Sequence, residues 1–253
     1  MGSANMPFEN STLVWITFTF VLAGTVKGVI GMGLPLIAMG LLTAVIGLHP
    51  AMALMLAPAF ITNVWQALAG GQAMSVLKRI WPFLIASTLS IWPGAMALTR
   101  VDVRLLSGLL GLLLALYGMM GLLRPPFKFA QDRETITGIA SGLANGVLAG
   151  MTGSFSIPGV PWLQALGLTR DQLIQGMGML FSLSSLCLAL ALNNQNLLNT
   201  EMGLLSAASV IPALAGMLLG QTIRKRLSEP QFRLVFFWSL ITLGLYIVVR
   251  VAF

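Results

Sequence analysis

Apolar residues fill most of the chain in long blocks that short polar stretches separate. Two of the blocks, at about 37 and 32 residues, exceed the roughly 20 residues that a transmembrane helix needs. Repeated blocks of at least span length predict an all-α polytopic membrane protein, because helices satisfy their own backbone hydrogen bonds within lipid. The predicted apolar segments are 12–48, 51–69, 80–98, 104–123, 136–167, 172–192, 202–221 and 232–252.

The two overlong segments are also the glycine-rich ones, with runs at 24–35 and 138–161. Glycine and proline interrupt helices and let the backbone approach a ligand closely. We therefore predict that each long segment is a broken or re-entrant helix rather than one straight span.

Similar landmarks recur in the two halves of the chain. Gly24-x-x-x-Gly28 resembles Gly142-x-x-x-Gly146, and both long segments close on a Gly-Leu pair, at 47–48 and 167–168. We predict two internal repeats, residues 1–127 and 128–253, each with a glycine-broken or re-entrant segment and three transmembrane helices. Such repeats are the usual build of secondary transporters. In this alignment Asn145 is the counterpart of Lys27.

The charges in the loops suggest how the two halves are related. If each long segment dips in and returns, or crosses twice, loops 70–79, 124–135, 168–171 and 222–230 share one side with nine cations, while the other side keeps Arg100, Arg104 and Arg250. If each long segment crosses once, the cations divide almost evenly. The positive-inside rule favours the first arrangement, with inverted repeats and both termini outside. Eight plain spans with a weak charge bias are the alternative.

Composition supports the membrane assignment. The chain is 57% hydrophobic and 8% charged, against roughly 25% charged residues in an ordinary soluble domain. The net charge of +7 does not indicate nucleic-acid binding, because the cations occupy short loops and form no basic stripe with interleaved aromatic residues.

Lys27 is the unusual residue of the first broken segment. A cation deep in a bilayer costs about 2.5–3.5 kcal/mol by insertion scales, so intramembrane lysines usually serve a function. Snorkelling to a surface is the alternative. We predict that Lys27 faces an anion path, together with backbone groups at Gly31 and Gly33 in the first break.

Polar residues near the breaks complete the predicted substrate site. Half-helix starts expose N–H groups that bind anions, and hydroxyls and amides on shared helical faces can add hydrogen bonds. Helix–helix contacts are the alternative role for these side chains. The residues are Thr152, Gly153, Ser154 and Ser156 in the second break, Asn145 before it, and Thr62, Asn63, Gln66, Gln175, Ser182 and Ser185 in the following spans.

The sequence disfavours several other functions. Every acidic residue lies in a loop or at a segment end, so a buried proton relay and an acidic cation site are missing. Coupling to protons would have to use His49, Asp171, Lys27 or the substrate itself. One histidine and one cysteine cannot build a metal cluster. We expect no cofactor, and no enzyme, because a nucleophile–base pair and a phosphate loop are not found.

The two glycine-rich runs, at 24–36 and 142–158, and Leu166–Asp171 resemble the TauE/SafE family of sulfite and organosulfonate exporters, which includes the YfcA-like members. The resemblance covers essentially the whole chain. It implies a multi-pass transporter of the bacterial inner membrane for sulfite, sulfoacetate or a related oxyanion. Many members carry three consecutive glycines where this chain has Met32–Pro35, so the resemblance does not choose the anion.

Taken together, these features predict a secondary transporter that exports a small anion by alternating access around a midplane site. A passive anion channel and a non-transporting membrane accessory protein are the alternatives. The predicted partners are the small anionic substrate and the lipid bilayer.

Overall fold

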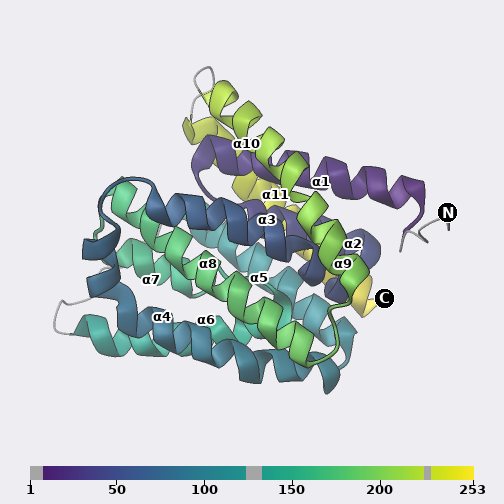
Figure 1. Ribbon diagram of the computed structural model, residues 1–253, viewed down its shortest axis with the longest axis horizontal. Coiled ribbons are helices and arrows are strands. Elements are labelled where there is room, and N and C mark those ends of the chain that lie inside the picture. The colour runs from purple at the N-terminus through teal and green to yellow at the C-terminus, as the bar shows by residue number, and fades with distance from the viewer. Residues whose placement is uncertain (1–7, 124–132, 225–228) are drawn as a thin grey trace.

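A computed structural model describes residues 8–123, 133–224 and 229–253, and all regular elements within these ranges are helical (Figure 1). The helices are α1 (Asn10–Ile30), α2 (Leu34–Ile46), α3 (Leu48–Leu68), α4 (Ala73–Met96), the 3₁₀ turn η1 (Ala97–Thr99), α5 (Val103–Leu123), α6 (Glu134–Thr152), α7 (Gly159–Ala165), α8 (Arg170–Asn194), α9 (Thr200–Ala208), α10 (Val210–Arg224) and α11 (Glu229–Ala252).

Seven stretches of the described residues are long and apolar enough to cross a membrane. They are α1, α3, α4 with η1, α5, α8, α9 with α10, and α11. The all-α polytopic fold is therefore confirmed. α6 is not among the seven, and α2 is a shorter apolar helix of 13 residues.

Both overlong segments are broken where glycine and proline cluster. Gly31 ends α1 in a left-handed conformation with φ of 81°, and Gly153 ends α6 in the same way with φ of 71°. A side chain is strained at such an angle, which explains why glycine stands there. Pro35 in the first turn of α2 then lets a helix restart, because the missing N–H is not needed at that position.

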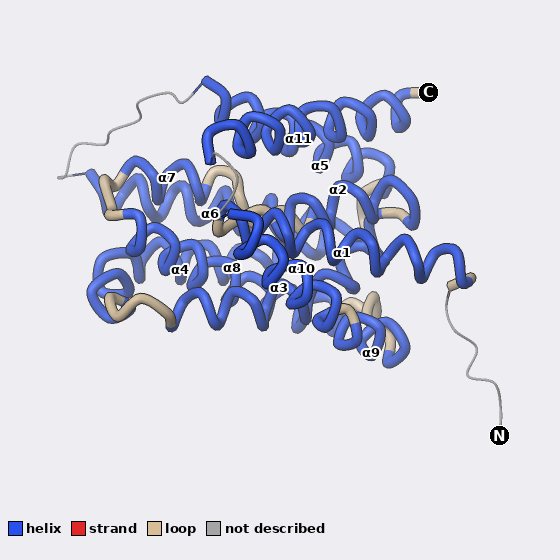
Figure 2. The backbone as a smooth tube through the Cα atoms, turned by 90° about the horizontal axis from the view of Figure 1, so that it is seen from above, coloured by secondary structure: helices blue, strands red, loops and turns tan. Residues whose placement is uncertain are grey.

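Each broken segment starts and finishes at the same end of the molecule. The Arg79 guanidinium pairs with Glu134 at the start of α6, at 2.6 Å, and donates to the carbonyl of Leu166 just after α7, at 3.0 Å. At the opposite end, Arg250 in the last turn of α11 donates to the carbonyl of Ala44 near the end of α2. The start of α1 and the end of α11 share that opposite end in both views (Figures 1 and 2).

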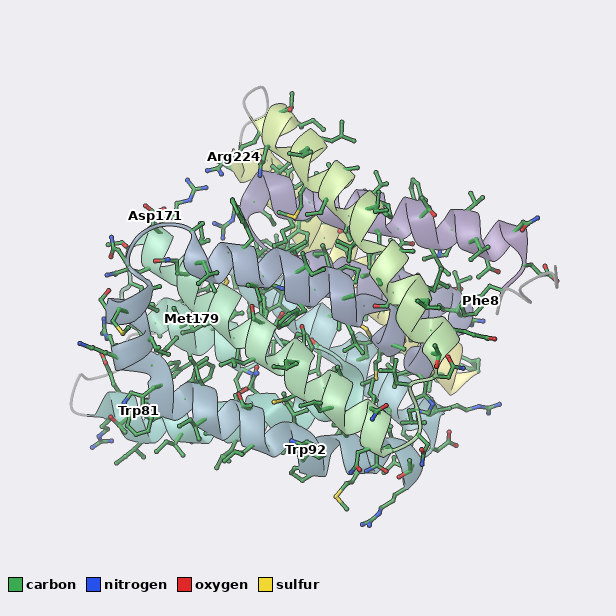
Figure 3. All side chains as sticks on the ribbon, viewed as in Figure 1. Phe8, Trp81, Trp92, Asp171, Met179 and Arg224 are labelled. Carbon is green, nitrogen blue, oxygen red and sulfur yellow. The ribbon has the colours of Figure 1, made fainter. Side chains whose placement is uncertain are left out.

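The cations of the described residues are distributed unevenly between the two ends. One end, here called the cation-rich end, carries Asp171 and Arg224, which appear together on the left of Figure 3. The loop between α3 and α4 and the loop before α8 lie on the same side in Figure 1. The other end, here called the opposite end, carries Arg100, Arg104 and Arg250. The cations in the loops and helix ends of the cation-rich end are Lys78, Arg79, Arg133, Arg170 and Arg224, and Arg233 lies one turn into α11.

Helices from the two halves pack in pairs, and α1 lies against α10 while α6 lies against α4. α3 pairs with α8, and α5 with α11. The first two pairs rely on glycine, because a Cβ at Gly28 would lie 2.9 Å from the Cα of Gly220, and one at Gly150 would lie 2.6 Å from the backbone nitrogen of Ala95. Small residues allow this close backbone approach between membrane helices.

Candidate anion site

Lys27 lies in the last turn of α1 and its side chain is only 3% exposed. Its ammonium donates to the hydroxyl oxygen of Thr62, at 3.1 Å, and to the amide oxygen of Asn63. Both partners belong to α3 and both are neutral. Among the described residues the only ion pair joins Arg79 and Glu134, so Lys27 has no carboxylate partner there.

The two neighbours of Lys27 are oriented by their own helix. The Thr62 hydroxyl donates to the carbonyl of Pro58, at 2.7 Å, and the Asn63 amide nitrogen donates to the carbonyl of Ala59, at 2.7 Å. These bonds turn the acceptor oxygens of both side chains toward Lys27. The helix therefore presents an oxygen pair that suits an ammonium group, while the third ammonium proton remains available.

The Lys27 cluster lies off the centre of α3, toward the cation-rich end. Asn63 is five residues from the end of α3 at Leu68, which is about 8 Å of helix rise, and fifteen residues from its start at Leu48, about 22 Å. A substrate held by Lys27 would therefore bind off the centre of α3.

Two glutamines join α3 to the start of α8 beside this cluster. The Gln66 amide donates to the carbonyl of Ile174 at 2.8 Å. The Gln175 amide donates to the carbonyl of Ala67 at 3.1 Å, and its oxygen accepts the N–H of Gln72 at 3.1 Å. We call Gln66 and Gln175 the glutamine latch. It fastens the loop between α3 and α4 to α8, one helical turn from Thr62 on the side of the cation-rich end.

The second break forms a separate polar cluster. A Cβ at Gly153 would lie 3.0 Å from Met39 of α2 and from Met52 of α3. Met52 precedes Thr62 by ten residues, which is about 15 Å along α3. Lys27, in the last turn before the first break, and Gly153, in the second break, therefore contact α3 at positions about ten residues apart. That the two breaks form one substrate site stays a prediction.

The hydroxyls of the predicted site fall into two groups. Thr152, Ser182 and Ser185 donate to the carbonyls four residues earlier in their own helices, each at 2.7 Å. A hydroxyl that donates its only proton to a backbone carbonyl cannot also donate to an anion. Ser154 behaves differently, because its buried hydroxyl has no hydrogen-bond partner among the described residues. Ser156 is buried in the same loop.

Asn145 holds the backbone together at a distance from Lys27. Its amide donates to the Ser87 hydroxyl at 3.1 Å, and its oxygen accepts the N–H of Gly159 at 3.0 Å. It thereby fastens the start of α7 to α6 and α4. These contacts give Asn145 a structural role, and its place in the substrate site stays a prediction.

The alignment that paired Lys27 with Asn145 is displaced by one helical turn. Gly31 donates its N–H to the carbonyl of Lys27, and Gly153 donates its N–H to the carbonyl of Ala149, both at 2.8 Å. Measured from the glycine that ends each helix, Ala149 and not Asn145 matches Lys27. The Gly-x-x-x-Gly spacing misled the prediction because four glycines follow one another at four-residue steps in α6.

Sequence patterns did not single out Ser184 or Ser206, two polar residues within the helix bundle. The Ser184 hydroxyl is buried and has no partner among the described residues, although its neighbour Ser185 was chosen. The Ser206 hydroxyl donates to the carbonyl of Leu54 at 2.9 Å and accepts the N–H of Ala57 at 3.0 Å. Pro58 has no N–H to donate to the Leu54 carbonyl, so a proline inside a helix was the sequence signal that this carbonyl needs another hydrogen-bond partner.

Comparison with known families agrees with this architecture. The family model described as sulfite exporter TauE/SafE matches residues 16–247. The chain belongs to the TauE/SafE family. The match includes both breaks, Lys27 and the glutamine latch, and it identifies a membrane transporter. No curated protein and no solved structure gives a significant match.

Proposed function

We propose that this TauE/SafE family member is a secondary transporter that exports a small anion across the bacterial inner membrane. The substrate class is sulfite, sulfoacetate or another organosulfonate. The observation that carries the proposal is the Lys27 ammonium, which is 3% exposed and bonded only to the neutral oxygens of Thr62 and Asn63 among the described residues.

A buried cation without a counterion favours an anionic ligand. Removing an ammonium from water carries a desolvation penalty of several kcal/mol, and two neutral hydrogen bonds recover only part of it. A sulfite or sulfonate oxygen on the third ammonium proton of Lys27 would add a charge-assisted bond, which is the stronger kind. An anion should therefore bind to this site with a more favourable free energy than a neutral solute of the same size.

The burial of Lys27 favours a carrier over a passive channel. A channel needs a continuous wet path past the charged group, whereas Lys27 is buried, with its ammonium bonded to α3. An enclosed site fits an occluded state of an alternating-access carrier. Opening at the cation-rich end would require Gln66 and Gln175 to release α8.

We further infer that residues 1–127 and 128–253 are inverted repeats. Two contacts support this relation. A Cβ at Gly31 would lie 3.6 Å from Ile174, the fifth residue of α8, and Gly153 has the equivalent neighbour in Met52, the fifth residue of α3. Each break thus lies against the other half, so a rocking of one half past the other would move both breaks.

In this scheme the anion meets the two breaks in sequence. Lys27 would neutralise it near the cation-rich end, and Ser154 with the backbone of Gly153 would receive it about 15 Å further along α3. The second break offers hydroxyl and backbone donors without a positive charge, so the anion would bind there more weakly and leave more easily.

Transport by reconstituted protein tests the proposal. Proteoliposomes would be assayed for uptake of ³⁵S-sulfite and labelled sulfoacetate with wild type, Lys27→Ala and Lys27→Arg. We expect Lys27→Ala to lower uptake at least about tenfold, since a charge-assisted bond of roughly 1.5–3 kcal/mol corresponds to that factor or more.

Lys78→Ala is the matched control, because Lys78 is an exposed lysine at the same end. Its uptake should stay within about twofold of wild type, as surface charges contribute little. Wild-type uptake by Lys27→Ala would refute the role of Lys27. Ohmic anion conductance through the wild type would favour the channel.

A further inference from the structure

A second basic pocket lies at the opposite end of the molecule from the Lys27 cluster. It has a volume of about 390 Å³ and is bounded by the junction of α2 and α3, the first turns of α5 and the last turns of α11. Arg104 of α5 and Arg250 of α11 both line it. The predicted site includes neither residue, and the roles proposed above leave both unexplained.

The lining of the pocket is suited to a negatively charged group. It contains two guanidinium groups and no acidic side chain. The Thr43 hydroxyl on its wall is buried and has no partner among the described residues. The carboxylate nearest in sequence, Asp102, accepts the backbone N–H of Arg104 at 2.8 Å and so caps α5.

The two arginines approach the pocket from different helices, and one of them is held by a third. Arg250 donates to the carbonyl of Ala44 in the last turn of α2, which positions its guanidinium at the pocket wall. The Arg104 side chain has no partner that the structure records. A guanidinium offers parallel N–H groups that match two oxygens of one oxyanion, so the two arginines can hold such a group between them.

The pocket is physically connected to the first break. α2 runs from Gly33, beside the break, to Gly47 on the pocket wall. Gly47 has φ of 86°, and a Cβ added there would meet no atom within 4 Å. A ligand in the pocket would therefore contact the end of α2, and the start of α2 follows Lys27 by a few residues.

We propose that Arg104, Arg250 and Thr43 form a second oxyanion-binding site at the opposite end of the molecule. The ligand is a sulfur or phosphorus oxyanion, either the transported anion on its way out or the phosphate of an anionic lipid. Only the assignment to the transported anion rests on the proposed function; the binding of an oxyanion does not.

Binding to the purified full-length chain tests the site without transport. Lys27→Ala would serve as background, so that the Lys27 cluster contributes no anion binding. ³⁵S-sulfite binding by Lys27→Ala alone would be compared with binding by three variants that add further changes to it. The first adds Arg104→Gln with Arg250→Gln, the second adds Arg104→Lys with Arg250→Lys, and the third adds Arg100→Gln. Arg100 is an exposed arginine at the same end that does not line the pocket.

We expect the double glutamine change to weaken residual sulfite binding at least tenfold, the double lysine change to weaken it less, and Arg100→Gln to leave it within twofold. Retention of phosphatidylglycerol, measured by native mass spectrometry, forms the second arm. Loss of lipid but not of sulfite binding with the double glutamine change would assign the site to lipid phosphate.

The proposal is overturned if neither sulfite nor phosphatidylglycerol binding depends on Arg104 and Arg250 in variants that elute as folded, monodisperse protein. Failure of the proposed function would look different. In that case the wild type would not transport sulfite, while oxyanion binding would still depend on the two arginines.

Discussion

Lys27 and Ala149 hold matched backbone positions, because the carbonyl of each accepts the N–H of the left-handed glycine that ends its helix, at 2.8 Å in both cases. One position carries a buried cation and the other a methyl group. Whatever symmetry relates the two backbones, their chemistry is therefore unequal, and only the first break can neutralise an anion with a side chain.

Lys27→Met should stabilise the protein while abolishing anion binding at the Lys27 cluster. The change removes an ammonium without a counterion and keeps the apolar stem, although Asn63 loses a hydrogen bond. For a chain of this size we expect the melting temperature to rise by about 2–4 °C for each kcal/mol gained. Thermal unfolding in detergent, with and without sulfite, measures both effects. A lower melting temperature would mean that the two hydrogen bonds outweigh the burial of the charge.

Ser154→Ala and Ser184→Ala should leave stability unchanged or slightly raised, because neither hydroxyl has a hydrogen-bond partner to lose. If the anion visits the second break, Ser154→Ala should still lower the maximal transport rate severalfold. Ser182→Ala is the control, since the Ser182 hydroxyl bonds its own helix. Equal transport by the Ser154 and Ser182 variants would remove the second break from the path.

Loss of the glutamine latch should open the Lys27 cluster toward the cation-rich end. A Thr62→Cys reporter in a Cys187→Ser background would be labelled with a membrane-impermeant maleimide. Gln66→Ala with Gln175→Ala removes the hydrogen bonds to Ile174 and Ala67, so labelling should become several times faster. Gln195→Ala, at the far end of α8, should leave the rate unchanged. Unchanged labelling in the latch variant would mean that other contacts keep the cluster closed.

Ser206→Ala should destabilise the protein, because Ser206 satisfies both the carbonyl of Leu54 and the N–H of Ala57 near Pro58. Two backbone groups left without partners cost about 1–3 kcal/mol each, so the melting temperature should fall by several degrees. Ser209→Ala is the comparison, because the Ser209 hydroxyl bonds only the Leu205 carbonyl of its own helix turn. Equal melting temperatures would mean that water replaces the Ser206 hydroxyl.

Local chemistry explains which parts of the fold were predictable. The breaks follow from glycine and proline, which act within a few residues, and the capping box at the start of α8 is set by equally local residues. Thr169 accepts the N–H of Gln172 at 3.3 Å and the Gln172 side chain accepts the N–H of Thr169 at 3.1 Å. Thr62, Asn63 and Gln66 were named as site residues because three polar residues within one helical turn are conspicuous in an apolar span, with Thr62 and Gln66 on one face.

The matching of the two halves was less predictable. Glycines at four-residue steps can be aligned one turn apart with no change in pattern, so the spacing alone could not separate Asn145 from Ala149. The backbone conformation at Gly153 decides it, because only the glycine that ends the helix takes up the left-handed angle.

By itself, the sequence determined an all-helical membrane protein, two broken segments and one intramembrane lysine, since these depend on hydropathy, helix-breaking residues and charge. The tertiary structure decided that Lys27 has neutral partners, that Lys27 and Gly153 contact α3 about ten residues apart, and that Arg104 and Arg250 share a pocket. These relations depend on which helices pack together. Close packing between residues far apart in the chain is set by the whole set of helix contacts, and no single segment encodes it.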